Sequence, residues 1–154
     1  MRVATAFGEV DVPEEVVLHF PAGIYGFPQF RRGCLLPYGT TNGLRWLQSL
    51  DEPSLVFLTV EPYLVFPGYE AELPEHETEA LELSSPSEAV IVTLVTITPE
   101  TEAVTTNLLA PIVVNTKTRQ ARQVVLDTDC YLTKHLIGGE LKEGFDAGIG
   151  AEDW

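Results

Sequence analysis

The stretch Ala89-Val-Ile-Val-Thr-Leu-Val-Thr-Ile-Thr98 decides the fold class. Each of its ten residues is apolar or β-branched, and none is glycine, proline or a charged residue. Residues of this kind favour extended backbone, and a near-continuous apolar run indicates a strand covered on both faces for part of its length. We therefore predict that this stretch is the central strand of a β-sheet.

Shorter apolar runs on both sides of this stretch predict the rest of the sheet. Val3 to Phe7 and Val10 to Val12, separated by Gly8-Glu9, are typical of a small hairpin. Further strands are predicted at residues 16–20, 34–38, 44–49, 55–60, 104–109, 111–115 and 121–127. An Asn42-Gly43 turn and the segment 116–120 are predicted to join neighbouring strands.

One segment has the signals of a helix rather than a strand. Between Leu73 and Leu83, Pro74 suits a first turn, and the glutamates that follow it complement the positive end of a helix dipole. Ser85-Pro-Ser-Glu88 then has a capping-box pattern, but the β-branched run behind it leaves room for one turn only. The sequence thus predicts a single sizeable helix.

About nine short strands and one short helix predict an all-β chain. A small, strongly bent β-barrel-like domain over residues 1–137 is the economical arrangement, because it leaves few sheet edges exposed. Residues 138–154 contain five glycines and no hydrophobic periodicity, so we expect a flexible, Gly-rich acidic tail there.

The charge balance narrows the classes of partner. Nine basic residues against 23 acidic residues give a net charge of -14, which disfavours direct binding to nucleic acid or to anionic membranes and attracts basic partners. Solubility alone is the alternative explanation for this charge. No apolar run approaches the roughly 20 residues of a membrane span, and the first residues lack a signal-peptide pattern, so we expect a cytoplasmic protein.

Catalytic and cofactor signals are missing from the sequence. The histidines at positions 19, 76 and 135 lie far apart, and we find no nucleophile elbow, P-loop or dinucleotide fingerprint. The protein is therefore predicted not to be an enzyme and to need no cofactor or metal. Cys34 and Cys130 are expected to be buried thiols rather than a disulfide.

Three blocks of sequence resemble a known family. The first is Phe20-Pro-Ala-Gly-Ile-Tyr-Gly-Phe27, and the second runs from Trp46 through Phe57 to Pro62 and Phe66. The third is Asn107-Leu-Leu-Ala-Pro-Ile-Val-Val-Asn-Thr-Lys-Thr-Arg119, followed by Gln123-Val-Val-Leu126. Their order and spacing are similar to those of the flagellar assembly factor family FliW from about Val3 to Tyr131. The glycines of the first block are expected to form a turn. Asn107 and Asn115 are expected to satisfy backbone groups of loops.

The resemblance implies a function based on binding. FliW-like proteins bind flagellin and also the RNA-binding translational regulator CsrA, whose repression of flagellin mRNA they block. Newly made flagellin removes them from CsrA, so that flagellin synthesis is coupled to export. A β-barrel that carries a small apolar ligand and an adaptor module of another kind remain as alternatives.

A partner surface is predicted beside the helix. The stretch Glu61-Pro-Tyr-Leu-Val-Phe-Pro-Gly-Tyr-Glu70 holds two prolines that bar it from a central strand, so some of its apolar side chains are expected to be exposed next to acidic residues. The predicted partner-binding residues are Tyr63, Phe66, Tyr69, Glu70, Glu72 and Glu75. The alternative is that the three aromatic residues cap an open end of the barrel.

Overall fold

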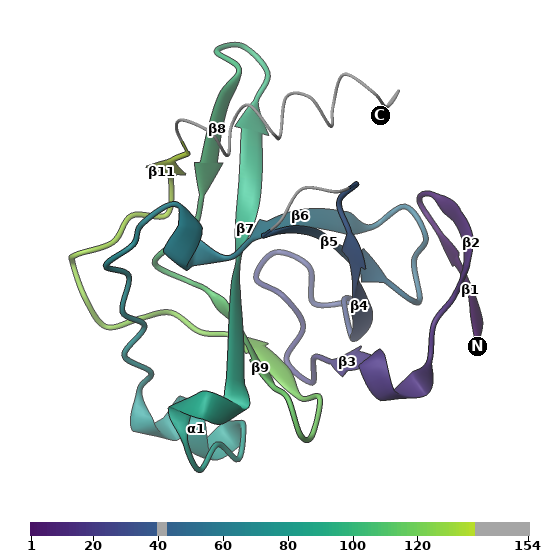
Figure 1. The fold of residues 1–154 in the computed structure, drawn as a ribbon, viewed down its shortest axis with the longest axis horizontal. Helices are drawn as coiled ribbons and strands as arrows, with labels where there is room; N and C mark the ends of the chain where they lie inside the picture. Colours follow the sequence, from purple (N-terminus) through teal and green to yellow (C-terminus); the bar gives the residue numbers. More distant parts are fainter. Residues whose placement is uncertain (40–42, 138–154) are drawn as a thin grey trace.

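The computed structural model describes residues 1–39 and 43–137, and this part contains eleven strands, one α-helix and three short 3-10 helices (Figure 1). The strands are β1 (Arg2–Thr5), β2 (Gly8–Asp11), β3 (Leu18–His19), β4 (Arg32–Pro37), β5 (Leu44–Ser49), β6 (Val56–Val60), β7 (Ala89–Thr98), β8 (Ala103–Thr106), β9 (Ile112–Asn115), β10 (Ala121–Gln123) and β11 (His135–Leu136). The helices are η1 (Glu14–Val16), η2 (Pro62–Leu64), α1 (Glu75–Ala80) and η3 (Pro86–Glu88).

The predicted central strand is confirmed with the same bounds. β7 pairs with β6 along one edge and with β8 and β9 along the other, all antiparallel, and it runs through the middle of the ribbon in Figure 1. Its consecutive residues Val92 and Thr93 are both buried, so both faces are covered at that point. No other strand of the described chain has three partner strands.

The edge of β7 that faces β8 and β9 is interrupted once. Thr106 pairs with Val95, and Ile112 pairs with Val92, so five residues of the outer chain lie opposite two residues of β7. The Asn107 side chain holds this loop, because its Oδ1 accepts hydrogen bonds from the backbone N–H groups of residues 109 and 110. The strand predicted for 104–109 therefore ends at Thr106, and the predicted role of Asn107 is confirmed.

The large sheet curls until its two ends meet. Its strand order is β10-β9-β7-β6-β5-β4-β3, and β11 pairs with β8. At the seam the backbone N–H of His19 donates to the carbonyl of Arg119 at 2.9 Å, and His19 forms a parallel bridge with Gln120. The predicted all-β, barrel-like architecture is thus confirmed.

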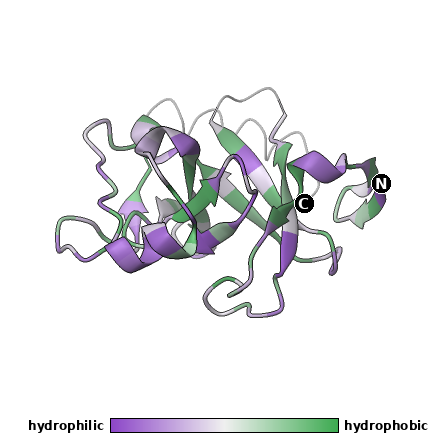
Figure 2. Ribbon diagram, turned by 90° about the horizontal axis from the view of Figure 1, so that it is seen from below, coloured by the Kyte–Doolittle hydropathy of each residue, from purple (hydrophilic) through white to green (hydrophobic). Residues whose placement is uncertain are grey.

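The main core fills the inside of this curl. Phe20, Phe30, Leu47 and Ile112 belong to it and are completely buried. Each large apolar side chain that is removed from water contributes about 1.5–3 kcal/mol of stabilisation, so this core stabilises the curled sheet. Figure 2 shows the hydrophobic residues along the strands and many of the hydrophilic ones on the helix and outer loops.

The first hairpin differs from its prediction in the position of its turn. β1 and β2 form a separate two-stranded sheet in which Thr5 pairs with Gly8, so the turn residues are Ala6 and Phe7 rather than Gly8 and Glu9. Thr5 Oγ1 explains the turn, because it donates to the Gly8 carbonyl at 2.6 Å and accepts from the Phe7 N–H at 3.0 Å.

Other strand boundaries are corrected, and one strand was not predicted. Val16 ends η1, with its N–H bonded to the Pro13 carbonyl, so β3 begins only at Leu18. β10 ends at Gln123 because the chain beyond it bonds to the 107–111 loop. β11 has two residues and left no periodic signal in the sequence. The predicted turn residues 40–42 and the predicted tail, 138–154, lie outside the described residues.

The helical predictions are confirmed. α1 lies within the predicted range and follows Pro74, and η3 is a single turn. Ser85 Oγ accepts from the Ser87 N–H at 3.3 Å, as expected of an N-cap. Glu88 Oε2, however, accepts from the N–H of Ser84 at 3.4 Å, one residue before the position that a capping box requires.

The block at residues 20–27 forms a tight turn, as predicted. Ile24 and Phe27 exchange backbone hydrogen bonds, and Ile24 lies in the main core. Tyr25, which occupies the tip of this turn, is 62% exposed. Gly23 has a positive φ of 70°, and a Cβ there would lie 2.8 Å from the Pro28 backbone.

We predict that Gly23→Ala destabilises the protein more than Gly26→Ala. Both glycines have positive φ, which costs an alanine about 1–2 kcal/mol, but only at Gly23 would the new Cβ also meet backbone atoms. The expected losses in the free energy of unfolding are about 2–4 kcal/mol for Gly23→Ala and about 1–2 kcal/mol for Gly26→Ala. Urea unfolding monitored by circular dichroism measures both, and equal losses would contradict the close contact with Pro28.

Candidate functional site

The crossing segment, residues 61–73, leaves the sheet at a proline. The last pair between β6 and β7 is Val60 with Thr93, and two more residues of the same register would place Pro62 opposite Ile91. Proline has no N–H to donate to a neighbouring strand, so pairing stops there. η2 begins at Pro62, and the crossing segment continues to α1.

A groove of about 690 Å³ lies between the crossing segment, α1, η3 and the first residues of β7. Apolar side chains form much of its lining, among them Leu73, Leu83, Pro86 and Val90. Val90 is 40% exposed although it lies in the central strand. The groove is thus an apolar surface that is open to solvent.

The charged residues that line the groove, Glu61 and Glu72, are both acidic. Six neighbouring glutamates form no ion pair within the described residues: Glu61, Glu70, Glu72, Glu75, Glu79 and Glu82. Two other glutamates form ion pairs: Glu77 lies 2.7 Å from Arg122, and Glu88 lies 3.6 Å from Lys117. The surroundings of the groove therefore carry uncompensated negative charge.

The structure brings some of the predicted partner-binding residues together. Tyr63, which is 48% exposed, and Glu72 both line the groove. Glu70 is exposed on the crossing segment, and Glu75 is exposed in the first turn of α1. The expectation of exposed apolar side chains in this stretch is met by Tyr63 and its neighbour Leu64. Their part in binding stays a prediction.

Of the other two predicted aromatic residues, one belongs to the packed interior and one is half-buried. Tyr69 is buried, and its hydroxyl donates to the Leu108 carbonyl at 2.7 Å. Burial raises the pKa of the Tyr69 hydroxyl far above its ordinary value, with smaller contributions from Tyr131 and Tyr63. Phe66 is half-buried and packs edge-on against Tyr131, with ring centres 5.5 Å apart. Tyr69 is thereby corrected from a surface residue to a core residue.

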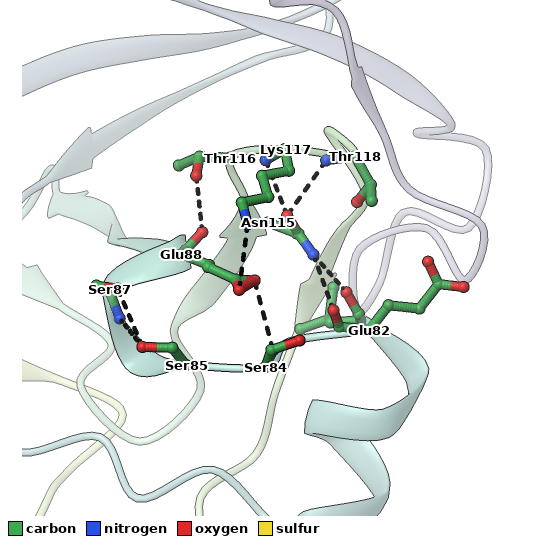
Figure 3. A network of polar contacts seen from close by, with 10 residues as sticks. Glu82, Ser84, Ser85, Ser87, Glu88, Asn115, Thr116, Lys117 and Thr118 are labelled. Carbon is green, nitrogen blue, oxygen red and sulfur yellow. Dashed lines mark hydrogen bonds and ion pairs between the residues drawn. The ribbon is translucent and has the colours of Figure 1, made fainter.

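Asn115 joins the chain that follows α1 to the end of β9, within a network of polar contacts (Figure 3). Its Nδ2 donates to the Leu81 carbonyl at 2.8 Å, and its Oδ1 accepts from the N–H groups of Lys117 and Thr118 at 2.8 and 3.2 Å. The side chain is buried and comes from the end of β9. The predicted role of this asparagine, satisfying the backbone groups of loops, is confirmed.

Several groove residues were missed by the sequence reasoning. Leu83, Pro86, Ile91 and Val90 were assigned to a helix end, a cap and a central strand, and nothing in their order indicates a shared surface. The one usable signal is Val90, because it is an apolar residue of a central strand that lies next to a turn. Only the register of β6 against β7 shows that its neighbour strand has already turned away.

The cysteines are unpaired, and they differ in environment. Cys34 is buried, and burial raises the pKa of its thiol, so the reactive thiolate is disfavoured. Cys130 is exposed, which corrects the expectation that both thiols are buried. Among the described residues, no group of three His, Cys, Asp or Glu side chains is placed to hold a metal ion, and no helix is long and apolar enough to span a membrane.

The comparison with known proteins decides the family. The profile described as FliW protein matches residues 2–137. The chain belongs to the FliW family. The flagellar assembly factor FliW of Heliobacterium modesticaldum is 42% identical over 138 residues, which is 89% of this chain and 90% of that protein. The FliW of Bacillus subtilis is 38% identical and spans 86% of this chain and 93% of its own length.

A solved structure supports the same conclusion. A crystal structure of the flagellar assembly factor FliW superimposes with a TM-score of 0.82 and 32% identity, and covers 91% of this chain and 99% of the other. The three sequence blocks that resemble FliW form the turn at 20–27, the β5–β6 pair and the 107–119 stretch. Within these blocks, only the end of the second, which runs on to Phe66, reaches the groove lining, at Glu61 and Tyr63.

We predict that Tyr69→Phe destabilises this FliW-family protein and that Tyr63→Phe does not. The first change leaves the buried Leu108 carbonyl without its hydrogen bond, at a cost of about 1–2 kcal/mol in the free energy of unfolding. The second removes an exposed hydroxyl and is expected to change stability by less than about 0.5 kcal/mol. Thermal melts of both variants measure this, and an unchanged Tyr69→Phe would refute the buried hydrogen bond.

Proposed function

We propose that this FliW-family protein is a stoichiometric regulator that binds CsrA and flagellin. Binding to CsrA relieves the repression of flagellin mRNA, and newly made flagellin removes the protein from CsrA. Synthesis of flagellin thereby follows its export. The observation that carries the proposal is the family match over residues 2–137, together with relatives named flagellar assembly factor.

The electrostatics of the chain support an RNA-binding protein as partner. CsrA must present a basic surface to RNA, and a protein with a net charge of -14 is attracted to such a surface. Once docked beside it, the same negative charge repels the phosphate backbone. Antagonism of this kind works even where the RNA site itself is left uncovered.

The proposed role requires neither catalysis nor a cofactor, and its site of action is the cytoplasm, where flagellin is made. A barrel that carries a small apolar ligand is less well supported. Such a carrier needs a hollow interior, whereas Phe20, Phe30 and Leu47 fill the inside of the described sheet.

Size-exclusion chromatography tests the proposal directly. The protein is mixed with CsrA from the same organism, and separately with its flagellin, and each mixture is compared with the single components. We expect a co-eluting complex in both mixtures, and flagellin added to the CsrA complex should displace CsrA. Failure to co-elute with either partner would refute the proposed function.

We predict that the association with CsrA is electrostatically assisted. The association rate, measured by stopped-flow fluorescence, should fall steeply as salt rises from about 50 to 500 mM, because screening shortens the range of attraction. Glu72→Lys and Glu75→Lys should also lower the rate at low salt. Glu100→Lys, which changes the net charge equally but lies in the turn between β7 and β8, is the matched control. A rate that is independent of salt would remove the electrostatic argument.

A further inference from the structure

The first residues of β7 have one open backbone edge. The N–H of Thr116 donates to the Glu88 carbonyl at 2.9 Å, which sets the phase of the antiparallel ladder with β9. Hydrogen-bonded and non-bonded pairs alternate in such a ladder, so Val90 and Val92 direct their N–H and C=O groups to β9. Ile91 lies between them and directs both groups to the opposite edge.

That opposite edge is left vacant by the crossing segment. If β6 continued in register, Pro62 would lie opposite Ile91, but the chain turns there into η2. The Pro62 carbonyl instead accepts hydrogen bonds from the N–H groups of Val65 and Phe66. Ala89 uses its N–H in the cap of η3, as a donor to the Pro86 carbonyl. Within the described chain, the Ala89 carbonyl and the N–H and C=O of Ile91 therefore have no hydrogen-bond partner.

The open edge lies in the groove. Ala89, Val90 and Ile91 are part of the groove lining, so a chain placed there could reach both the backbone edge and the apolar wall. Glu61 and Glu72 line the same groove, and no Lys or Arg of the described residues does. Hydrogen-bonding edge, apolar wall and negative charge are thus combined within one surface.

We propose that this groove binds an extended segment of a protein partner, which pairs with Ile91 as an added β-strand. In such β-strand addition, main-chain hydrogen bonds supply affinity and the alternating side chains supply specificity. The segment carries apolar side chains for the groove and Lys or Arg for Glu61 and Glu72. The inference deepens the proposed function and rests on it for the statement that the occupant belongs to a protein partner.

Other occupants fit these features less well. A second copy of this chain brings its own net charge of -14 to an acidic groove, and nucleic acid brings phosphates. A small apolar ligand would cover the wall of Leu73 and Leu83 but would leave the Ile91 backbone groups unsatisfied. A basic, apolar peptide strand satisfies the charge, the wall and the backbone together.

Amide hydrogen exchange followed by NMR tests the open edge and its occupant. In the free protein the Ile91 amide should exchange faster than those of Val90 and Val92, which bond to β9. The probe is a blocked peptide, Lys-Val-Lys-Val-Lys, and its addition should slow exchange at Ile91. The inference would be overturned if the Ile91 amide of the free protein were as protected as its neighbours. It would also be overturned if saturating peptide left exchange at Ile91 unchanged.

Two methylated peptides test strand pairing itself. One carries N-methyl groups on both valine amides and the other on two lysine amides, so that each removes the donors of one edge of the peptide strand. One of the two should bind about two- to tenfold more weakly per lost hydrogen bond than the other. Equal affinities would mean that the peptide does not bind as a strand. The peptide Glu-Val-Glu-Val-Glu should not bind, since it reverses the charge.

Protein variants give an independent measurement. Ile91→Pro removes the N–H that the ladder with β9 does not use, and Ile91→Ala shortens the side chain but keeps that N–H. The proline variant should bind the lysine peptide about two- to tenfold more weakly than the alanine variant. Glu72→Gln should also weaken binding, and Glu100→Gln should not.

The outcomes separate this inference from the proposed function. Co-elution with CsrA or flagellin, combined with no peptide binding, overturns the strand site and leaves the proposed function standing. Peptide binding without either complex supports the strand site and refutes the proposed function. Ile91 protection that depends on protein concentration, with a dimer in analytical ultracentrifugation, would assign the edge to a second copy and overturn the proposal.

Discussion

The pairing of β7 along both edges is the constraint on which the rest of the structure depends. A buried backbone must have its hydrogen bonds satisfied, and in β7 this is done by β9 and β8 on one edge and, from Thr93 to Val95, by β6 on the other. The two faces of the strand then divide the protein. Val92 and Leu94 face the core inside the curl, whereas Ile91 packs with the outer cluster around Tyr69. The groove exists because β6 ends its pairing with β7 at Thr93. The residues of β7 that pair with β9, Ala89 to Val92, therefore have no strand on their other edge.

The elements predicted well from the sequence are those determined by their own residues. β7 and β5 have the predicted bounds because their apolar residues alone favour a strand, and α1 lies after Pro74 as expected. The misses arise where a polar side chain competes with the ladder. Asn107 folds the outer chain into a loop that periodicity does not reveal, and Thr5 shifts the first turn by two residues. β11 depends on pairing with Thr105 and Thr106, which lie far away in the sequence.

Only part of the candidate site could be predicted from the sequence, again because some of its contacts join residues that are distant in the sequence. Two prolines in the crossing segment indicate that it leaves the sheet, and the glutamates beside it indicate an acidic surface. Neither signal tells which way each aromatic side chain turns. Tyr69 turns inward because the Leu108 carbonyl, distant in sequence, offers its hydroxyl a partner, while Tyr63 remains in the groove. Of the three expected aromatic residues, Tyr63 alone lines the groove, which also includes Val90 from a strand that was expected to be covered.

The seam between His19 and Gln120 also bears on how the chain acquires its structure during synthesis. The two residues that close the curl lie near opposite ends of the described chain, so their contact is strongly non-local, and contacts of this kind form slowly. A ribosome releases β3, β4, β5 and β6 long before Gln120 emerges. Until then Phe20 and Leu47 lack the neighbours Ile112 and Ala121 that cover them in the finished core. The nascent sheet thus exposes apolar surface for most of its translation, and it can close only after the chain has been made as far as Ala121.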